Sequence, residues 1–515
     1  MAELTILAEG AKEATSRPRL PESCAMVIFG ASGDLTSRKL MPALFHLFMD
    51  HLLPKCFAVI GCANTSYSDE QFRDRACRAV REAMAGKVDE SQLGEFAQLL
   101  FYVTDDFSDP AAYTQLDQAL DKVDRDCATR GNRLYYLATP PDAFPTIVQH
   151  LGSAGLGRPR DPEKNWARII IEKPFGRDRK SACELNKVVK GAFQEEEIYR
   201  IDHYLGRETV QNLFVLRFAN GIFEPVWNRR YIDHVQIIMA ETLGVENRGA
   251  YYEQAGVVRD VVQNHVLQML SLIAMEPPAR FQANAVRDEK SKLLRAVRPI
   301  PLDRLEEFAV RGQYLEGLVE GEKVPAYRSE PKVDPRSTTE TYAALKLFID
   351  NWRWASVPFY LRSGKRLAKR VTEVTVHFRQ VPHIVFGDNL NSGILPNILS
   401  ICVQPDEGIN LRFSAKLPGT AMEIRPVKME FRYNDAFGGE SPPAYETLIL
   451  DCMLGDSTLF TRADTVESAW ELLDPLLERW KQDGAKGLAS YRAGAWGPPE
   501  ADAFMKRDGR EWLEL

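Results

Sequence analysis

Apolar runs that end at glycine or proline recur through the first 200 positions of the chain. The runs 25–29, 57–60, 134–138 and 167–171 consist mostly of aliphatic and aromatic residues, which is typical of strands buried on both faces of a parallel sheet. Between them lie segments whose apolar residues recur every three or four positions, as on one face of a helix. This alternation of strands and helices predicts a doubly wound α/β domain.

The pattern changes beyond residue 210, where apolar and polar residues alternate along several short runs. Alternation is clearest over 371–378, and further strand-like runs lie at 235–239, 398–403, 410–415 and 427–433. A strand with this pattern buries one face and exposes the other, as is usual in antiparallel sheets. We therefore predict a second, α+β domain with a large, mainly antiparallel sheet that has one solvent-exposed face.

Two longer segments in this half of the chain have helical periodicity. A helix is predicted over 466–480, with its two tryptophans on one side. A long amphipathic helix is predicted over 252–274, and one of its faces would carry Val258, Val262, His265 and Met269. An inward-facing histidine is usually a core residue with a hydrogen-bond partner, so spacing alone assigns no function to His265.

Length and charge set the number of domains and exclude one class of partner. A chain of 515 residues is too long to fold around one ordinary hydrophobic core. We expect a loose tail at 1–20, a first domain at 21–202 and a second at 203–515. The formal net charge of -7 argues against nucleic acid as the main partner, although it allows a local cationic pocket.

The eight cysteines are scattered without a CxxC pair, which in a chain of this length is typical of free thiols in a reducing compartment. A predicted strand separates the nearest pair, Cys56 and Cys62, so they lie too far apart for a disulfide. No apolar run reaches membrane-spanning length, and the first twenty residues do not resemble a signal peptide. We therefore expect a cytoplasmic protein without a membrane partner.

The first apolar run leads directly into a glycine turn and then into a predicted helix. Gly30 would allow the sharp turn, and Gly33 would let a ligand approach the backbone. Strand, glycine turn and helix start together place backbone N–H groups where they can bind a pyrophosphate, as in Rossmann-like domains. The spacing is GxxGxL rather than GxGxxG, so a turn that needs glycine only for its geometry remains the alternative.

The end of the second apolar run is where such domains distinguish NAD from NADP. An acidic residue there binds the ribose hydroxyls of NAD, whereas an arginine binds the 2′-phosphate of NADP. Asn64 stands at this place and carries no charge. The residues by themselves therefore leave the choice of cofactor open.

Two polar segments follow predicted strands. Lys173 comes just after the run 167–171, at the end of a strand where α/β sheets bind ligands; an exposed lysine in a turn is the alternative. The segment 200–208 contains an imidazole, a phenol and a guanidinium within five residues, at His203, Tyr204 and Arg207, and these groups suit a bound phosphate monoester. A helix cap or an interdomain turn with some solvated charges is the alternative for this segment.

Eight motifs are spread over nearly the whole chain: GASGDL at 30–35, EKPFG at 172–176, RIDHYLG at 200–206, RGAYYEQAGVVRDVVQNHVLQML at 248–270, LRSGK at 361–365, QPDEG at 404–408, AYETLILD at 444–451 and GPPEAD at 497–502. Together they resemble the glucose-6-phosphate dehydrogenase family, for which RIDHYLG is highly specific. The resemblance implies oxidation of C1 of β-D-glucose 6-phosphate to 6-phosphogluconolactone with hydride transfer to NADP, in the oxidative pentose phosphate pathway. The domain at 21–202 would bind the dinucleotide, and the domain at 203–515 would bind substrate and form oligomers.

The resemblance also implies roles for individual residues. His265 would be the general base that accepts the C1 hydroxyl proton, and Asp202 would be its carboxylate partner. The groups expected around the sugar phosphate are Lys173, His203, Tyr204, Arg207, Glu241, Asp260, Lys365, Arg370 and Gln404. Those expected around the cofactor are Gly30, Ala31, Ser32, Gly33, Asp34, Leu35, Asn64, Tyr102 and Lys173. Pro174 resembles a proline that the family holds in a cis peptide, and no metal is expected.

Three positions depart from the pattern of this family. Arg207 replaces a usual lysine, which keeps the charge but changes reach and geometry. Asn64 replaces the arginine of NADP users, and losing that contact removes about 1.5–3 kcal/mol of binding. NADP is therefore the expected cofactor, with Ser32 still near its 2′-phosphate, while NAD or dual use stays open. Val371 stands where a lysine would help bind a second, structural NADP, so that site is not expected.

The family associates through its large sheet, so a homodimer or homotetramer is expected. One alternative function is a dehydrogenase of another sugar, against which the intact RIDHYLG segment argues. Another is a non-catalytic regulatory paralogue, against which the presence of His265, Asp202 and Lys173 argues.

Overall fold

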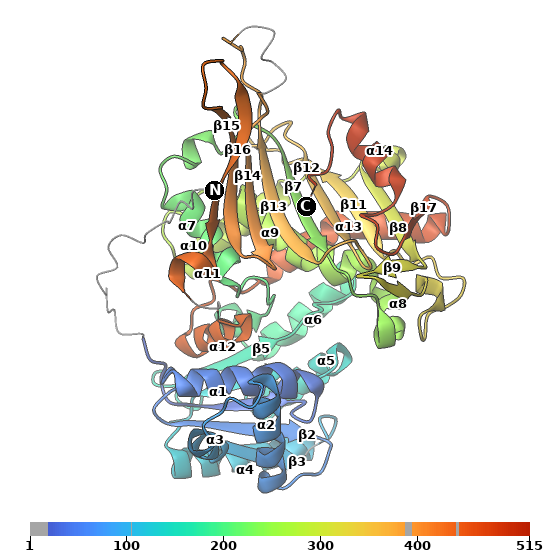
Figure 1. The fold of residues 1–515 in the computed structure, drawn as a ribbon. Helices are drawn as coiled ribbons and strands as arrows, with labels where there is room; N and C mark the ends of the chain where they lie inside the picture. Colours follow the sequence, from blue (N-terminus) through green and yellow to red (C-terminus); the bar gives the residue numbers. More distant parts are fainter. Residues whose placement is uncertain (1–18, 105, 387–393, 439–441, 515) are drawn as a thin grey trace.

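The computed structural model describes residues 19–104, 106–386, 394–438 and 442–514. Most of the predicted tail, residues 1–18, lies outside the described residues. Two β-sheets organise the rest of the chain, and Figure 1 shows the first of them below the second. No helix among the described residues combines the length and apolarity that crossing a bilayer requires.

The first sheet contains six parallel strands in the order β3-β2-β1-β4-β5-β6, which is the order of a doubly wound dinucleotide-binding domain. Its strands are β1 (Cys24–Phe29), β2 (Phe57–Ala63), β3 (Leu100–Thr104), β4 (Arg133–Leu137), β5 (Ala167–Ile171) and β6 (Ile198–Arg200). Every residue of β1, β2 and β4 is buried, which explains their continuous apolar sequence. The predicted α/β architecture is confirmed.

Helices connect these strands, and four of the six begin at polar caps. They are α1 (Met41–Met49), α2 (Asp69–Ala83), α3 (Glu90–Ala97), α4 (Pro110–Cys127), α5 (Phe144–Ser153) and α6 (Arg179–Ala192). Ser68 and Asp178 form capping boxes at α2 and α6, and Asp109 accepts from a backbone N–H at the start of α4. Local sequence therefore marks where α2, α4 and α6 begin.

The second sheet contains nine strands in the order β16-β15-β14-β13-β7-β12-β11-β8-β17. They are β7 (Ile232–Ala240), β8 (Ala309–Leu315), β11 (Tyr342–Leu347), β12 (Phe359–Gly364), β13 (Val371–Phe378), β14 (Ile398–Gln404), β15 (Gly408–Lys416), β16 (Ile424–Arg432) and β17 (Leu488–Arg492). Only the pairs β7–β12 and β8–β17 are parallel, so the prediction of a mainly antiparallel sheet is confirmed. A small hairpin, β9 (Gly317–Val319) and β10 (Glu322–Val324), lies apart from it.

Helices cover one face of the large sheet and connect it to the first domain (Figure 1). They include α7 (Glu208–Phe218), α9 (Leu267–Ala274), α10 (Ala283–Arg295), α12 (Ala444–Leu454) and α13 (Ala463–Asp483). Helix α14 (Pro499–Arg507) packs on the other face, where the ring of Phe504 lies 6.0 Å from that of Tyr360. Late helices pack on early ones, since α12 contacts α1 and α13 contacts α6. The prediction of a helix over 466–480 is confirmed, although α13 extends beyond it at both ends.

The prediction of one solvent-exposed face is correct only at one end of the large sheet. Most of β16 is exposed, but residues 371–376 of β13 are buried on both faces. The end of the chain covers the neighbouring strand β7: Gln236 Nε2 donates to Glu511 O, and Leu513 N donates to Gln236 Oε1. Strand alternation could not show this cover, because it comes from residues that are distant in sequence.

Candidate active site

The segment predicted as one amphipathic helix over 252–274 consists of three pieces, so that prediction is wrong. Helix α8 (Gly249–Val257) contains Gly256 at φ 61°, a π-helix (Val258–Val266) follows, and α9 completes the segment. A Cβ at Gly256 would lie 2.3 Å from Glu340 Oε1, so only glycine fits this break. Residues 260–274 are all buried because strands β7 and β12 and helix α13 pack around the π-helix. π-Helical geometry inside a helical segment often occurs at functional sites.

His265 lies on the π-helix and meets Asp202, which follows β6. His265 Nδ1 is 2.5 Å from Asp202 Oδ1, and both residues are almost completely buried. The ammonium of Lys173 lies 3.0 Å from His265 Nε2 and can only donate. Nε2 must therefore accept, so the ring proton is on Nδ1 and is donated to Asp202.

The pKa values of this pair favour a neutral imidazole beside an ionised carboxylate. Burial lowers the pKa of His265 below its usual value, and the charge of Asp202 only partly offsets this effect. Burial raises the pKa of Asp202, but the charge and hydrogen bond of His265 outweigh it and bring that pKa to about 2. Near neutral pH Nε2 of His265 thus carries no proton of its own, and its lone pair accepts the hydrogen bond from Lys173.

The side chains of the 200–208 segment surround this pair. The ring of His203 lies 4.7 Å from that of His265, and the ring of Tyr204 lies 4.4 Å from it. The guanidinium of Arg207 sits 5.2 Å from the centre of the Tyr204 ring, and its buried Nε has no hydrogen-bond partner in the described structure. Burial lowers the pKa of His203 well below its usual value. A donor without a partner beside a neutral imidazole and a phenol suits a phosphate oxygen.

Most of the other predicted substrate residues are brought to the same place in two groups. Lys173 Nζ donates to the backbone carbonyl of Asp260 at 2.9 Å. Gln404 Nε2 donates to the Tyr204 hydroxyl at 3.0 Å. Lys365 Nζ donates to Glu241 Oε2 at 2.5 Å, and the charge of Lys365 also lowers the pKa of Asp260, although less than that of Lys173 does.

Arg370 stands apart from these groups. It is exposed, and no hydrogen bond or ion pair connects it to another described residue. By contrast, the first part of the 362–370 basic cluster is buried: Arg362, Lys365 and Arg366 line the strand end and the turn after β12. The predicted cis peptide at Pro174 is present, and a second one precedes Pro405.

Three residues beside this site make contacts that could not be predicted from sequence spacing alone. Tyr136 donates to Glu172 Oε1 at 2.5 Å, and burial raises the pKa of this carboxyl group. Tyr445 also bonds Glu172, and its ring lies nearly parallel to that of His203 at 6.5 Å. Glu172 and Tyr445 stand in two of the motifs named above, but only the fold shows that β5 and α12 bring them to His203.

The glycine turn lies at the end of β1 and has the geometry that a dinucleotide requires. Gly30 has φ 86°, and a Cβ there would lie 2.5 Å from Ala138 O, so the turn is packed against the end of β4. A helical segment starts at residue 34, and its first N–H groups face the turn. Ser32 and Thr65 share a hydroxyl hydrogen bond of 3.2 Å, and Tyr102 donates to Thr65 O at 2.7 Å.

The remaining predicted cofactor residues surround this turn. Asn64 is exposed at its rim, and Asp34 points outward to an exposed ion pair with Arg38. Ala31 is buried and Leu35 is partly buried beneath the turn. The turn, the end of β2 and the start of a helix thus fit the diphosphate and ribose of a dinucleotide, whose nicotinamide would accept a hydride.

Asp202, His203 and His265 also offer three ligand atoms that lie within 4.8 Å of one another. The nearby ammonium of Lys173 opposes a second cation, and the short bond to Asp202 already uses His265 Nδ1. We therefore interpret this cluster in terms of proton transfer.

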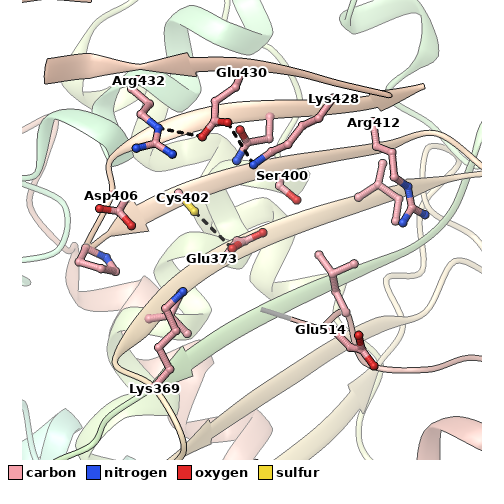
Figure 2. A pocket seen from close by; sticks show the side chains of 15 residues that line it. Lys369, Glu373, Ser400, Cys402, Asp406, Arg412, Lys428, Glu430, Arg432 and Glu514 are labelled. Carbon is pink, nitrogen blue, oxygen red and sulfur yellow. Dashed lines mark hydrogen bonds and ion pairs between the residues drawn. The ribbon is translucent and has the colours of Figure 1, made fainter. Parts of the chain in front are cut away.

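A hollow of about 340 Å³ lies elsewhere, on the face of the large sheet opposite its helices (Figure 2). Figure 2 shows Glu430 between Arg432, at 2.8 Å, and Lys428, at 3.4 Å, and Cys402 donating to Glu373. Val371 lines its floor. Because cations and carboxylates balance one another here, the hollow has no clear preference for an anion, and we assign it no ligand.

A doubly wound parallel sheet with a glycine turn, beside a buried Asp–His pair, defines a dinucleotide-dependent oxidoreductase. Two family models match, described as "Glucose-6-phosphate dehydrogenase, NAD binding domain" over residues 27–212 and "Glucose-6-phosphate dehydrogenase, C-terminal domain" over residues 214–513. The chain belongs to the glucose-6-phosphate dehydrogenase family.

Similar proteins match along almost their whole length. The glucose-6-phosphate 1-dehydrogenase of Chlamydia pneumoniae is 46% identical over 501 residues, which cover 97% of each chain. That of Aggregatibacter actinomycetemcomitans is 48% identical over 493 residues, or 95% of this chain and 97% of the relative. A solved structure titled "Glucose-6-phosphate dehydrogenase in complex with its substrate glucose-6-phosphate" superposes with a TM-score of 0.88 at 34% identity, covering 96% of this chain and 99% of that one.

Proposed function

We propose that this chain oxidises C1 of β-D-glucose 6-phosphate to 6-phospho-D-glucono-1,5-lactone and transfers the hydride to NADP, as the first step of the oxidative pentose phosphate pathway. The observation that carries this proposal is the buried hydrogen bond between His265 and Asp202, with the side chains of 203–207 packed around it. The family membership of the chain and the substrate named for the superposed structure support the same reaction.

In this mechanism His265 Nε2 takes the proton of the C1 hydroxyl while the C1 hydride leaves for the nicotinamide. The sugar thereby loses two electrons and two hydrogens and becomes a lactone, and the imidazolium formed is stabilised by Asp202. A base of this kind contributes roughly 10²–10⁴-fold to the rate. Asp202 also fixes the ring, because the same Oδ1 that binds His265 accepts from the backbone N–H of Tyr204 at 3.1 Å.

Lys173 must change partners when the substrate binds. In the free protein its ammonium donates to His265 Nε2, the atom that the C1 hydroxyl needs. We infer that the hydroxyl takes this place and that Lys173 then donates to the sugar. His203, Tyr204 and Arg207 bind the phosphate, while Glu241, Asp260, Lys365 and Gln404 lie where they can contact hydroxyl groups of the ring.

We further propose that residues 21–202 form the dinucleotide-binding domain and residues 203–515 the substrate-binding and oligomerisation domain. The six-stranded sheet ends with β6, and the next strand, β7, already belongs to the large sheet. The catalytic pair joins these two parts, since Asp202 follows the last strand of one sheet and His265 lies on a helix that packs against the other.

The large sheet supports the proposal of a homodimer or homotetramer. Strand β16 forms one edge of it, and Val427 and Met429 are exposed there. An exposed edge strand with apolar side chains favours pairing with a second copy. A cytoplasmic location is proposed on the free thiols of the chain, which include buried Cys24 and Cys452.

A spectrophotometric assay at 340 nm with glucose 6-phosphate and either NADP or NAD tests the proposed reaction. Turnover of glucose 6-phosphate that far exceeds turnover of other sugars would support it. Turnover of another sugar at higher kcat/KM would favour a different sugar dehydrogenase. Absence of turnover in a folded protein that still binds the phosphate ester would favour a regulatory paralogue.

A further inference from the structure

The cofactor site contains a cation at a place where the sequence pattern did not indicate one. Arg75 lies on α2, eleven positions after Asn64, and its Nη2 donates to the backbone carbonyl of Ser32 at 2.9 Å. Ser32 is the third residue of the GASGDL turn. The guanidinium of Arg75 is therefore held at the rim of the turn where the adenosine ribose of a dinucleotide lies.

Most donors of Arg75 remain available. A guanidinium has five N–H donors, and only the bond to Ser32 is present among the described residues. Its Nε is buried and has no hydrogen-bond partner there. None of the described carboxylates forms an ion pair with Arg75; Asp69 accepts from the backbone N–H of Tyr102, and Asp34 pairs with Arg38. A buried donor without a partner is costly, and an anion at this place would remove that cost.

The surroundings of Arg75 fit a phosphate monoester on the ribose. The hydroxyls of Ser32 and Thr65 lie beside it and bond each other at 3.2 Å. Residues 64–66 contain no acid that would bind the two ribose hydroxyls of NAD or repel a phosphate. The charge of Arg75 also reaches the phenol of Tyr102, whose hydroxyl is bonded to Thr65 O.

We propose that Arg75 binds the 2′-phosphate of NADP and replaces the arginine that is missing at position 64. This inference rests on the proposed function and specifies the cofactor of that same site. A guanidinium that reaches the phosphate from α2 serves the same purpose as one at the end of β2, because both sides border the ribose. Asn64 then does not imply a preference for NAD.

The test is a titration of NADPH and NADH binding by nicotinamide fluorescence, without any sugar substrate. Arg75→Gln should raise the Kd for NADPH roughly ten- to a hundredfold, the range for a lost charge-assisted hydrogen bond, and leave the Kd for NADH unchanged. Arg75→Lys keeps the charge without the planar fork and should fall between the two. Arg78→Gln is the matched control, because Arg78 is exposed on the same helix one turn further along.

A rescue variant separates phosphate binding from support of the turn. Adding Asn64→Arg to Arg75→Gln should restore tight NADPH binding. If Arg75→Gln had only damaged the glycine turn, the added arginine would not restore that binding. Equal losses of NADPH and NADH binding, or no loss of NADPH binding, would overturn the proposal. Since binding is measured without glucose 6-phosphate, a failure of the proposed reaction would appear separately, as absent turnover in a protein that still prefers NADPH.

Discussion

His265 Nδ1 lies 2.5 Å from Asp202 Oδ1, although 63 positions separate the two residues along the chain. Asp202 stands after the last strand of the parallel sheet, and His265 stands on a π-helix packed against the large sheet. The proposed catalytic pair therefore forms only when both halves of the chain are folded and docked. Substitution of either residue should reduce the rate of the reaction more than it reduces the stability of the surrounding fold.

Replacing the proposed base should abolish most turnover and leave binding in place. His265→Ala is expected to lower kcat by roughly 10²–10⁴-fold, because general-base assistance is lost. The KM for glucose 6-phosphate should change little. Steady-state kinetics measure both values, and His383→Ala, at an exposed position, is the control. A large rise in KM with kcat intact would contradict the role of His265.

The pH dependence of kcat/KM should reveal the effect of the carboxylate partner, Asp202, on His265. In the wild type, kcat/KM should fall as the pH drops through the pKa of His265, which burial holds below 6.5. Asp202 raises that pKa, so Asp202→Asn should move the acid limb to still lower pH. The plateau value of kcat/KM should fall on the order of 10²-fold, because the imidazole of His265 is then a weaker base and is also less well oriented. An acid limb that stays in place would show that Asp202 does not act on His265.

Arg207 should contribute binding energy through the phosphate of the substrate. Arg207→Met is expected to raise the KM for glucose 6-phosphate roughly ten- to a hundredfold, since a charge-assisted hydrogen bond is lost. Arg207→Lys should cost less because the charge remains. Kinetics with unphosphorylated glucose provide the control, and an equal loss with glucose would place Arg207 elsewhere than at the phosphate.

The glycine turn should tolerate no side chain at its first position. Gly30→Ala adds a Cβ 2.5 Å from Ala138 O at φ 86°, so both contact and conformation are unfavourable. Gly86→Ala is the matched control, because Gly86 has φ 77° and open space around it. The control should lose about 1–2 kcal/mol of unfolding free energy, the cost of the left-handed conformation alone. Gly30→Ala should lose more in urea unfolding and should bind NADPH more weakly.

Association through the edge of the large sheet should be sensitive to charge. Met429→Lys places a charge among the exposed apolar residues of β16 and should shift the oligomer toward monomer in sedimentation velocity. Leu318→Lys is the control, because Leu318 is also exposed but lies on the separate β9–β10 hairpin. An unchanged sedimentation coefficient for Met429→Lys would place the interface on another surface.

Many of the strands, but not their order in the sheets, could be predicted from local patterns. Buried parallel strands need apolar side chains on both faces, so β1, β2, β4 and β5 appear as continuous runs in the sequence. The turn at Gly30 is similarly local, since only glycine combines its backbone angle with contact to Ala138. The motifs identified the family because they contain both kinds of local requirement, which are buried apolar positions and a glycine turn.

Other features depend on contacts between distant residues, and only the tertiary structure decided them. Periodicity predicted an amphipathic helix around His265, but packing on all sides makes it a buried, interrupted π-helix. Arg75 shows the same limit at the cofactor site: on α2 it looks like any helical arginine until the fold places it against Ser32. The sequence by itself determined most of the parallel strands, the glycine turn and the set of reactive groups. Docking of the two domains decided which groups meet, because side-chain contacts form through space rather than along the chain.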